Sequence, residues 1–314
     1  MRAVRNTERG IAVVTAPGEP PDGAAGRVSV HVASSGICGT DLHLVSFGPS
    51  PVTLGHEFAG RLADGTPVAV LPVEHCGRCS RCRAGAVQQC TEAVSAMYGV
   101  SRDGGMAEVA WVDPGCARPL PGRLGIEDAC LVEPLAVALH GIHRAGVSAG
   151  MRVLVIGAGP IGLCAVAGLR AAGMSPDVQA HGAERQAAAL RLGASPEVGV
   201  DYDVVLDAAG TQRSLDDAVR LVRPGGTVGI LSSFWSPVGI GLGLLMKEVV
   251  LVPAFTYGHH EGRSEFDEAA ALLAQTPEIA ATLITHRFDL SDAAEAFRVA
   301  ADRGTGAIKV VLVP

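Results

Sequence analysis

The chain has 314 residues, of which 48% are hydrophobic, and a formal net charge of −7. This composition suits one or two domains with sizeable cores, and no basic run with interleaved aromatic residues points to a nucleic-acid partner. Apolar runs fall short of the roughly 20 residues that a membrane-spanning helix needs, and the charged N-terminus lacks the apolar core of a signal peptide. We therefore expect a cytoplasmic protein with no nucleic-acid and no membrane partner.

The first third of the chain consists of short apolar runs separated by turns rich in glycine and proline. Apolar and polar residues alternate over 27–35, and similar runs occupy 67–73 and 106–112. A period of two is typical of strands with one buried face. These runs predict an irregular, β-rich domain.

The pattern changes near residue 134. Helical spacing over 133–146 is followed by a buried strand at 152–157 and a helix at 160–173. The later predicted strands are 177–180, 203–210, 227–231 and 248–255, and the later helices are 183–194 and 213–226. Strands that alternate with helices in this way predict an α/β fold with a doubly wound parallel sheet.

The tail of the chain is predicted to be helix at 264–275, strand at 283–288, helix at 290–304 and strand at 307–314. We expect this tail to return to the first domain and complete it.

A glycine-rich turn follows the first strand of the α/β region. Gly157, Gly159 and Gly162 have the G-x-G-x-x-G spacing, with Pro160 and Ile161 between them, and a helix begins there. In this strand–turn–helix setting the glycines allow a tight turn, close approach of a pyrophosphate and close packing of helix and strand. The turn predicts a dinucleotide site, and a turn without a ligand is the alternative.

The end of the second strand bears on the choice of dinucleotide. We place that end at Ala180, where an acidic residue would bind the 2′-hydroxyl of NAD. His181 and Arg185 follow instead, whereas Asp177 and Glu184 are out of register. A site without an acid and with cationic neighbours favours NADP over NAD.

Four of the eight cysteines, Cys76, Cys79, Cys82 and Cys90, lie within fifteen residues. In a reducing compartment this spacing predicts a closed tetrahedral zinc shell, which is structural because it has no position left for substrate. An iron–sulfur cluster and four unmetallated thiols are the alternatives.

A second, dispersed group consists of Cys38, His56, Glu57 and Glu133. One thiolate, one imidazole and one or two carboxylates are typical of a catalytic zinc site with an open position. Each residue also has an ordinary interpretation: a small buried cysteine, a core histidine, or a carboxylate at a helix N-terminus. Their joint presence favours the metal site.

These motifs together resemble the zinc-dependent medium-chain dehydrogenase/reductase superfamily. The stretches "GICGTDLH", "GHEFAG", "EPLAVALHG" and "GAGPIG" occur in the order typical of that family, and "EPLAVALH" is similar to its sorbitol/polyol and threonine dehydrogenase branch. The resemblance implies a GroES-like catalytic domain at 1–135, completed by 258–314, and a Rossmann domain at 136–257. It also implies a homodimer or homotetramer.

The resemblance further implies a mechanism for a zinc-dependent oxidoreductase. Cys38 and His56 would bind the catalytic zinc, with Glu57 or Glu133 as a further ligand, and the four-cysteine group would bind a second zinc. Thr40 would accept the proton of the alcohol, and His43 would pass it to solvent. Hydride would move between a secondary alcohol, polyol or sugar, or its ketone, and NAD(P).

Two other functions stay open at this point. One is a zinc-free quinone or enoyl reductase with the same fold, and the other is a non-catalytic nucleotide-binding scaffold. The intact ligand set argues against both, and the sequence does not name the substrate.

Overall fold

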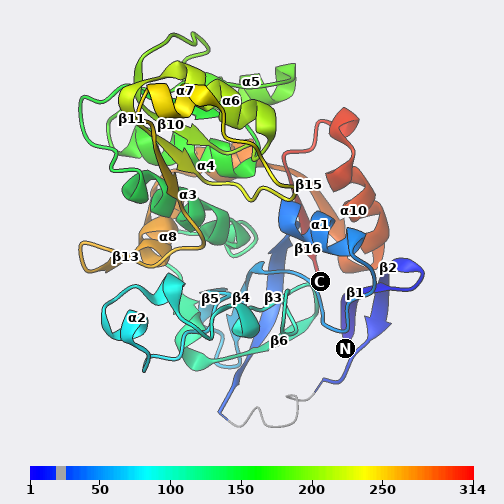
Figure 1. Cartoon of the computed structure of the whole chain (residues 1–314). Helices are drawn as coiled ribbons and strands as arrows, with labels where there is room; N and C mark the ends of the chain where they lie inside the picture. The colour runs from blue at the N-terminus through cyan, green and yellow to red at the C-terminus, as the bar shows by residue number, and fades with distance from the viewer. Residues whose placement is uncertain (19–25) are drawn as a thin grey trace. The chain divides into compact units, whose positions relative to one another are not determined.

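The structure is a computed structural model that describes residues 1–18 and 26–314. The chain forms two compact units, one made of residues 1–133 with 266–314 and the other of residues 134–265. We call them unit 1 and unit 2 and describe each by itself (Figure 1). Within the described residues, no helix is both long and apolar enough to cross a membrane.

Unit 1 is built on a seven-stranded sheet with the order β15-β16-β3-β4-β5-β7, in which β6 also pairs with β3. All of its pairs are antiparallel except β15 with β16. The strands are β3 (Val28–Gly36), β4 (Glu57–Leu62), β5 (Pro67–Val70), β6 (Val109–Val112), β7 (Ala117–Pro119), β15 (Ile284–Asp289) and β16 (Lys309–Val313). Strands from the tail of the chain therefore share a sheet with strands from its beginning.

The rest of unit 1 surrounds this sheet. A separate hairpin consists of β1 (Arg2–Thr7) and β2 (Gly10–Thr15). The helices are α1 (Gly39–Ser46), α2 (Ser80–Arg83), α8 (Glu265–Gln275), α9 (Glu278–Leu283) and α10 (Ala293–Ala301). Short 3₁₀ helices occupy Val87–Gln89, Val94–Ala96, Pro114–Cys116, Ala129–Leu131, Leu290–Asp292 and Arg303–Thr305.

Unit 2 contains a five-stranded, all-parallel sheet with the order β12-β11-β10-β8-β9. Its strands are β8 (Val153–Ile156), β9 (Asp177–Gln179), β10 (Tyr202–Asp207), β11 (Val222–Ile230) and β12 (Val250–Pro253). Its helices are α3 (Val132–Arg144), α4 (Pro160–Ala171), α5 (Ala183–Arg191), α6 (Gln212–Leu221) and α7 (Leu242–Met246), and a small hairpin joins β13 (His259–His260) to β14 (Arg263–Ser264). The predicted α/β fold with a doubly wound parallel sheet is confirmed.

The strand order of unit 2 fixes where a ligand can bind. The chain runs from β8 to β9 on one side and then returns to β10 on the other side of β8. Ligands of open parallel sheets bind at such a switch point, at the carboxyl ends of the strands. The segment that leaves the carboxyl end of β8 is the glycine-rich turn.

Several elements were not predicted. The hairpin of β1 and β2 lies in a stretch with many charged residues, and β4 begins with the charged Glu57, which is 1% exposed. Helix α1 has eight residues and only a weak apolar face. Tyr98 is 1% exposed and belongs to the core of unit 1.

Candidate metal centres and dinucleotide site

Unit 1 brings Cys38, His56 and Glu57 together. Cys38 is the N-cap of α1, just after β3, whereas His56 directly precedes β4 and Glu57 is its first residue. One ligand atom from each of the three lies within 4.8 Å of the others. His56 and Glu57 are buried, at 7% and 1% exposure. A thiol, an imidazole and a carboxylate in this arrangement form a donor set that fits zinc.

Asp41 supports this group and was not predicted as part of it. Its Oδ2 accepts a hydrogen bond from the backbone N–H of Cys38 at 2.8 Å, and its Oδ1 lies 3.4 Å from Nδ1 of His56. Neither of these two buried atoms has a hydrogen-bond partner among the residues that the structure describes, so Asp41 is placed to orient the imidazole through Nδ1 and to leave Nε2 for a metal. Burial alone would lower the pKa of His56, but Asp41 and Cys38 outweigh it and raise the pKa well above its ordinary value. The site therefore attracts positive charge.

Lys309 is a second unpredicted member. Its side chain is 1% exposed, and its Nζ donates hydrogen bonds to the two carboxylate oxygens of Glu57 at 2.6 and 2.8 Å and to the carbonyl of Ile37 at 3.2 Å. Burial lowers the pKa of this ammonium, but Glu57 and Cys38 outweigh burial, so the pKa is raised. A lysine inside the apolar run "AIKVVLVP" was the signal that could have identified it.

The remaining predicted residues of this site lie on α1 and α3. Thr40 and His43 stand three positions apart on α1, where Thr40 is half-buried and His43 is exposed. Glu133 lies in the first turn of α3 and is 8% exposed. Within the described residues, the group of ligand atoms inside 4.8 Å includes Glu57 but not Glu133.

The four-cysteine lobe, residues 76–90, forms the second group of potential ligands. Sulfur atoms of Cys76, Cys79, Cys82 and Cys90 lie within 4.8 Å of one another, and no disulfide joins them. Backbone N–H groups donate to three of the sulfurs at 3.3 to 3.4 Å. The pKa of the Cys79 thiol is lowered to about 6. The largest cause is the hydrogen bond that its sulfur accepts from the backbone N–H of Cys82. Four convergent sulfurs with such donors suit a tetrahedral metal.

In unit 2 the glycine-rich turn has the geometry that a pyrophosphate needs. Gly157 has a φ of +97°, and its N–H bonds to the carbonyl of Gln179 at 2.9 Å. A Cβ on Gly162 would lie closer than 3.0 Å to the carbonyl of Gly157, whereas a Cβ on Gly159 would meet no atom within 4 Å. Gly159 caps α4, which begins at Pro160, without a side-chain hydrogen bond. Free N–H groups and open space at this N-terminus fit a phosphate.

The residues expected near the ribose lie where β9 passes into α5. Strand β9 ends at Gln179, so Ala180 directly follows it, and His181 is exposed while Arg185 is half-buried on α5. Asp177 stands at the beginning of β9, where its Oδ2 accepts a hydrogen bond from the Tyr202 hydroxyl at 2.6 Å. Asp177 therefore pairs with Tyr202 at the end of β9 opposite to the expected ribose site.

One β-rich unit carries a cysteine–histidine–carboxylate group and a four-cysteine group. Together with a parallel sheet that has a glycine-rich turn, these features are those of a zinc-binding dehydrogenase. Two family models match the chain, the alcohol dehydrogenase GroES-like domain over residues 24–122 and the glucose dehydrogenase C-terminus over residues 126–313. The chain belongs to the zinc-dependent medium-chain dehydrogenase/reductase family and is an oxidoreductase.

Individual relatives agree with this assignment. L-Galactonate-5-dehydrogenase of Escherichia coli K12 is 30% identical over 85% of this chain and 86% of its own length. L-Idonate 5-dehydrogenase (NAD(P)(+)) of the same organism is 30% identical over 90% and 91%. The solved structure of a protein described as a zinc-binding dehydrogenase from Sinorhizobium meliloti 1021, bound to NADP, covers 100% of this chain and 99% of its own, with 31% identity and a TM-score of 0.86.

Proposed function

We propose that the protein oxidises a secondary hydroxyl of an open-chain polyol or sugar acid, or reduces the corresponding ketone, with a nicotinamide coenzyme. The observation that carries the proposal is the group of Cys38, His56 and Glu57. The names of the two Escherichia coli relatives, which specify carbon 5 of a sugar acid, support the substrate class. We assign the metal chemistry to unit 1 and coenzyme binding to unit 2.

In this proposal Cys38 and His56 hold a zinc ion, and either Glu57 or Glu133 adds a carboxylate. Bound zinc supplies a Lewis acid that lowers the pKa of a substrate hydroxyl. Asp41 keeps the imidazole of His56 in its binding orientation. Burial of the group keeps bulk water from competing for the open position.

Two residues of α1 move the proton. Thr40 accepts it from the substrate hydroxyl and passes it towards His43, which stands three positions further along the helix and so lies on the same face. His43 is exposed and can release the proton to solvent. The half-buried hydroxyl and the exposed imidazole therefore form a path out of the site.

We assign a second, structural zinc to the four-cysteine lobe. Four sulfurs complete a tetrahedron, so no position remains for substrate, and metal binding would order a segment with little core of its own. A zinc-free quinone or enoyl reductase would leave the ligand set of unit 1 without a role, and a non-catalytic scaffold would need neither Thr40 nor that set.

For the coenzyme we favour NADP over NAD. Gly157, Gly159, Pro160, Ile161 and Gly162 would bind the pyrophosphate, and His181 and Arg185 would approach a 2′-phosphate. Positions 180–182, directly after β9, carry no acid that would repel that phosphate. The Sinorhizobium relative with bound NADP supports this choice.

We also propose a homodimer or homotetramer that forms in the cytoplasm. Strand β12 is an edge strand of the unit 2 sheet, and Val250 and Phe255 are 51% and 55% exposed. An exposed apolar edge strand is a template for pairing with a second copy. Eight free thiols suit a reducing compartment.

One experiment tests the function. The metal content of the purified protein is measured, and polyols, sugar acids, cyclitols and simple secondary alcohols are assayed with both coenzymes through the absorbance of the reduced nicotinamide. About two zinc ions per chain with coenzyme-dependent oxidation of a polyol or sugar acid supports the proposal. About one zinc and no turnover of any alcohol would identify a scaffold instead.

A further inference from the structure

The sequence contains a single asparagine, Asn6, which lies on β1 and is 4% exposed. Its side-chain Nδ2 donates hydrogen bonds to the carbonyls of Val45 and Gly48 at 3.0 and 2.5 Å. Its backbone carbonyl accepts a third bond, from the N–H of Ser50 at 2.8 Å. This one residue therefore ties β1 to the end of α1 and to the loop that follows the helix.

The two acceptors of the side chain explain why the position carries an amide. Both are carbonyl oxygens, so they need a neutral group with two N–H donors, which asparagine has and aspartate lacks. The carbonyl of Val45 is one of the last four of α1, which have no N–H partner within the helix itself. Asn6 therefore acts as a C-terminal cap of α1 that is supplied by a strand distant from the helix in sequence.

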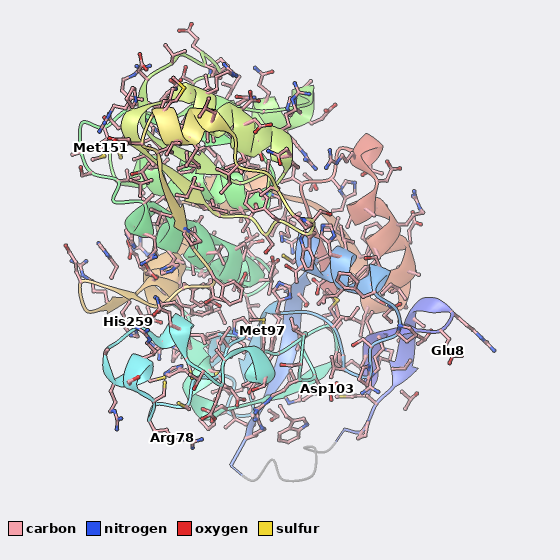
Figure 2. The ribbon with its side chains drawn as sticks, viewed as in Figure 1. Glu8, Arg78, Met97, Asp103, Met151 and His259 are labelled. Carbon is pink, nitrogen blue, oxygen red and sulfur yellow. The ribbon has the colours of Figure 1, made fainter. Side chains whose placement is uncertain are left out.

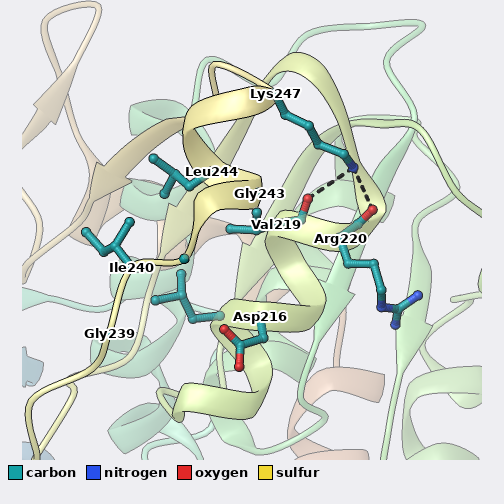
Figure 3. Close-up of a pocket in the computed structure, with 10 residues that line it drawn as sticks. Asp216, Val219, Arg220, Gly239, Ile240, Gly243, Leu244 and Lys247 are labelled. Atoms are coloured by element: carbon teal, nitrogen blue, oxygen red, sulfur yellow. Dashed lines mark hydrogen bonds between the residues drawn. The ribbon is translucent and has the colours of Figure 1, made fainter.

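The C-terminus of α6 has a similar cap. Nζ of Lys247 donates hydrogen bonds at 2.7 to 3.1 Å to three carbonyls, those of Val219, Arg220 and Val222. Figure 3 shows two of these bonds. Helix α6 also buries apolar residues at a spacing of three, Leu215, Ala218 and Leu221. Packing of this buried side orients α6 even without the cap.

Helix α1 depends more on its hydrogen bonds, because packing orients it only weakly. It has eight residues and a weak apolar face, from which Leu42 and Val45 pack, partly buried, against a core cluster of unit 1. At the N-terminal end Asp41 accepts a hydrogen bond from the backbone N–H of Cys38, and at the C-terminal end Asn6 holds the carbonyl of Val45. Bonds at both ends therefore fix the rotation of α1 about its axis.

Thr40 and His43 lie between these two fixed ends. They stand three positions apart and so share a face of the helix, and His43 belongs to the last turn, two residues before the carbonyl that Asn6 holds. If this turn opened or rotated, the imidazole would move away from the hydroxyl. A displacement of about 1 Å is enough to slow a reaction by about a hundredfold.

We propose that Asn6 is a positioning residue for proton transfer, which fixes the last turn of α1 and so keeps the imidazole of His43 within reach of the Thr40 hydroxyl. The proposal rests on the proton path of the proposed function. Asn6 acts through the helix, because its amide is engaged by two backbone carbonyls. Its loss should slow proton transfer and leave the metal ligands in place, because Cys38 stands at the other end of α1.

The first test needs no substrate. Protein labelled with ¹³C in threonine methyl groups and histidine rings is used to measure the nuclear Overhauser effect between Thr40 and His43, which His43→Gln assigns. We expect the wild type to show this effect and Asn6→Leu, which has the same branching at Cγ but no N–H donor, to lose it. Lys247→Met is the matched control: it removes the cap of α6 and should lower stability while the effect persists.

The second test follows the reaction with the panel of polyols and sugar acids described above. Asn6→Leu should lower kcat by about tenfold or more with zinc content unchanged. The solvent isotope effect on kcat should rise, because proton transfer becomes the slow step. In a His43→Gln background Asn6→Leu should have no further effect on kcat, since both changes act on the same step. A fall in kcat with an unchanged isotope effect would mean that Asn6 has only a structural role, which overturns the proposal.

A measurement on the unaltered protein covers the case in which Asn6→Leu does not fold. Because the chain has one asparagine, protein labelled with ¹⁵N only in the asparagine side chain gives one pair of N–H signals that needs no assignment. Both protons should exchange with solvent much more slowly than those of free asparagine, because each is bonded to a carbonyl. Exchange as fast as in free asparagine would show that the cap does not form, which overturns the proposal.

The outcomes distinguish this proposal from the one beneath it. If the wild type shows no Overhauser effect between Thr40 and His43, or turns over no member of the panel, the proposed function itself is wrong. If the wild type passes both tests and Asn6→Leu keeps the Overhauser effect and the isotope effect of the wild type, the proton path stands and the role of Asn6 is wrong.

Discussion

Gly36 lies directly against the carboxylate of Glu57, so closely that a methyl group on Gly36 would overlap Oε2. The two residues are paired across β3 and β4, which fixes their separation. The carboxylate thus occupies the space that any side chain at position 36 would need.

This packing predicts that Gly36→Ala is destabilising by about 1–3 kcal/mol, the usual range for an overfilled buried site. It should also weaken zinc binding at the Cys38–His56 site, because Glu57 must move. Denaturant unfolding and metal analysis measure the two effects. Gly39→Ala is the control, because a Cβ there meets no atom within 4 Å. Equal stability of both variants would contradict the packing argument.

Cys38→Ser should abolish turnover while the fold survives. Serine is nearly isosteric with cysteine but binds zinc poorly at neutral pH, so the metal should be lost. The fold should survive because Cys38 is a half-buried N-cap residue and serine is favoured at helix N-caps. We expect one zinc per chain fewer and an unchanged thermal midpoint to within a few degrees. Retention of wild-type turnover would rule out the catalytic assignment.

Cys79→Ser should act mainly on stability. The four-cysteine lobe has a small core of its own, formed around Val73, Cys90 and Ala93, so metal binding provides much of its folding free energy. Arg78 is exposed in this lobe (Figure 2), and so are Arg81 and Arg83. Trypsin should therefore cut the variant, or the chelator-treated wild type, within 76–90 much faster than the zinc-loaded protein. Equal cleavage rates would argue for an unmetallated lobe.

Arg185→Ala should weaken NADPH binding more than NADH binding. Loss of the contact between the guanidinium and the 2′-phosphate should weaken NADPH binding by about tenfold or more. NADH has only a hydroxyl at that position, so its affinity should change little. Titration of coenzyme fluorescence gives both dissociation constants. An unchanged ratio of the two constants would remove the basis for the NADP assignment.

Acid should destabilise unit 2 through Glu265. Its carboxylate is 1% exposed and accepts hydrogen bonds from Nδ1 of His140 and His143 at 2.7 and 2.8 Å and from the N–H of Gly258 at 2.8 Å. Burial raises the pKa of Glu265, but these bonds outweigh burial and lower it far below its ordinary value. A carboxyl with a depressed pKa contributes stability above its unfolded pKa of about 4.3, and that stability is lost as the pH falls.

The free energy of unfolding of the wild type should therefore begin to fall near pH 5 and continue to fall as the pH approaches the depressed pKa of the folded state. Glu265→Gln should be less stable at pH 7 by about 1–3 kcal/mol, because the amide cannot accept all three bonds. It should also lose less stability over the acid range. Parallel pH profiles for the two proteins would exclude Glu265 as the acid-sensitive group.

The parts of the structure that sequence could predict are those whose signal is local. The four cysteines lie within one loop, and the glycine turn is a single strand–turn–helix unit, so spacing alone carries the geometry. Lys309 and Glu57 are 252 positions apart, and nothing local to either shows that they pair. Strand β4 was missed for the same reason, because the partner that permits a buried glutamate at its start lies at the other end of the chain.

Strand β9 was predicted at 177–180 and is found at Asp177–Gln179. Its pairing with β8, which joins Leu154 to Asp177, could not be predicted, because three residues are too few for a periodic signal. Asp41 was missed because a carboxylate in the first turn of a helix has an ordinary explanation in the helix dipole. Only the distance to His56 reveals its second role.

The discontinuity of unit 1 has a consequence for synthesis. Translation delivers Cys38, His56 and Glu57 early, but Lys309 belongs to β16, the last strand, and emerges only after all of unit 2 has been made. At about 5–20 residues per second, the nascent protein spends tens of seconds with the thiol, imidazole and carboxylate of this site already made and the ammonium of Lys309 not yet translated. Newly made chains in that interval should be the form most exposed to capture of the wrong metal and to oxidation.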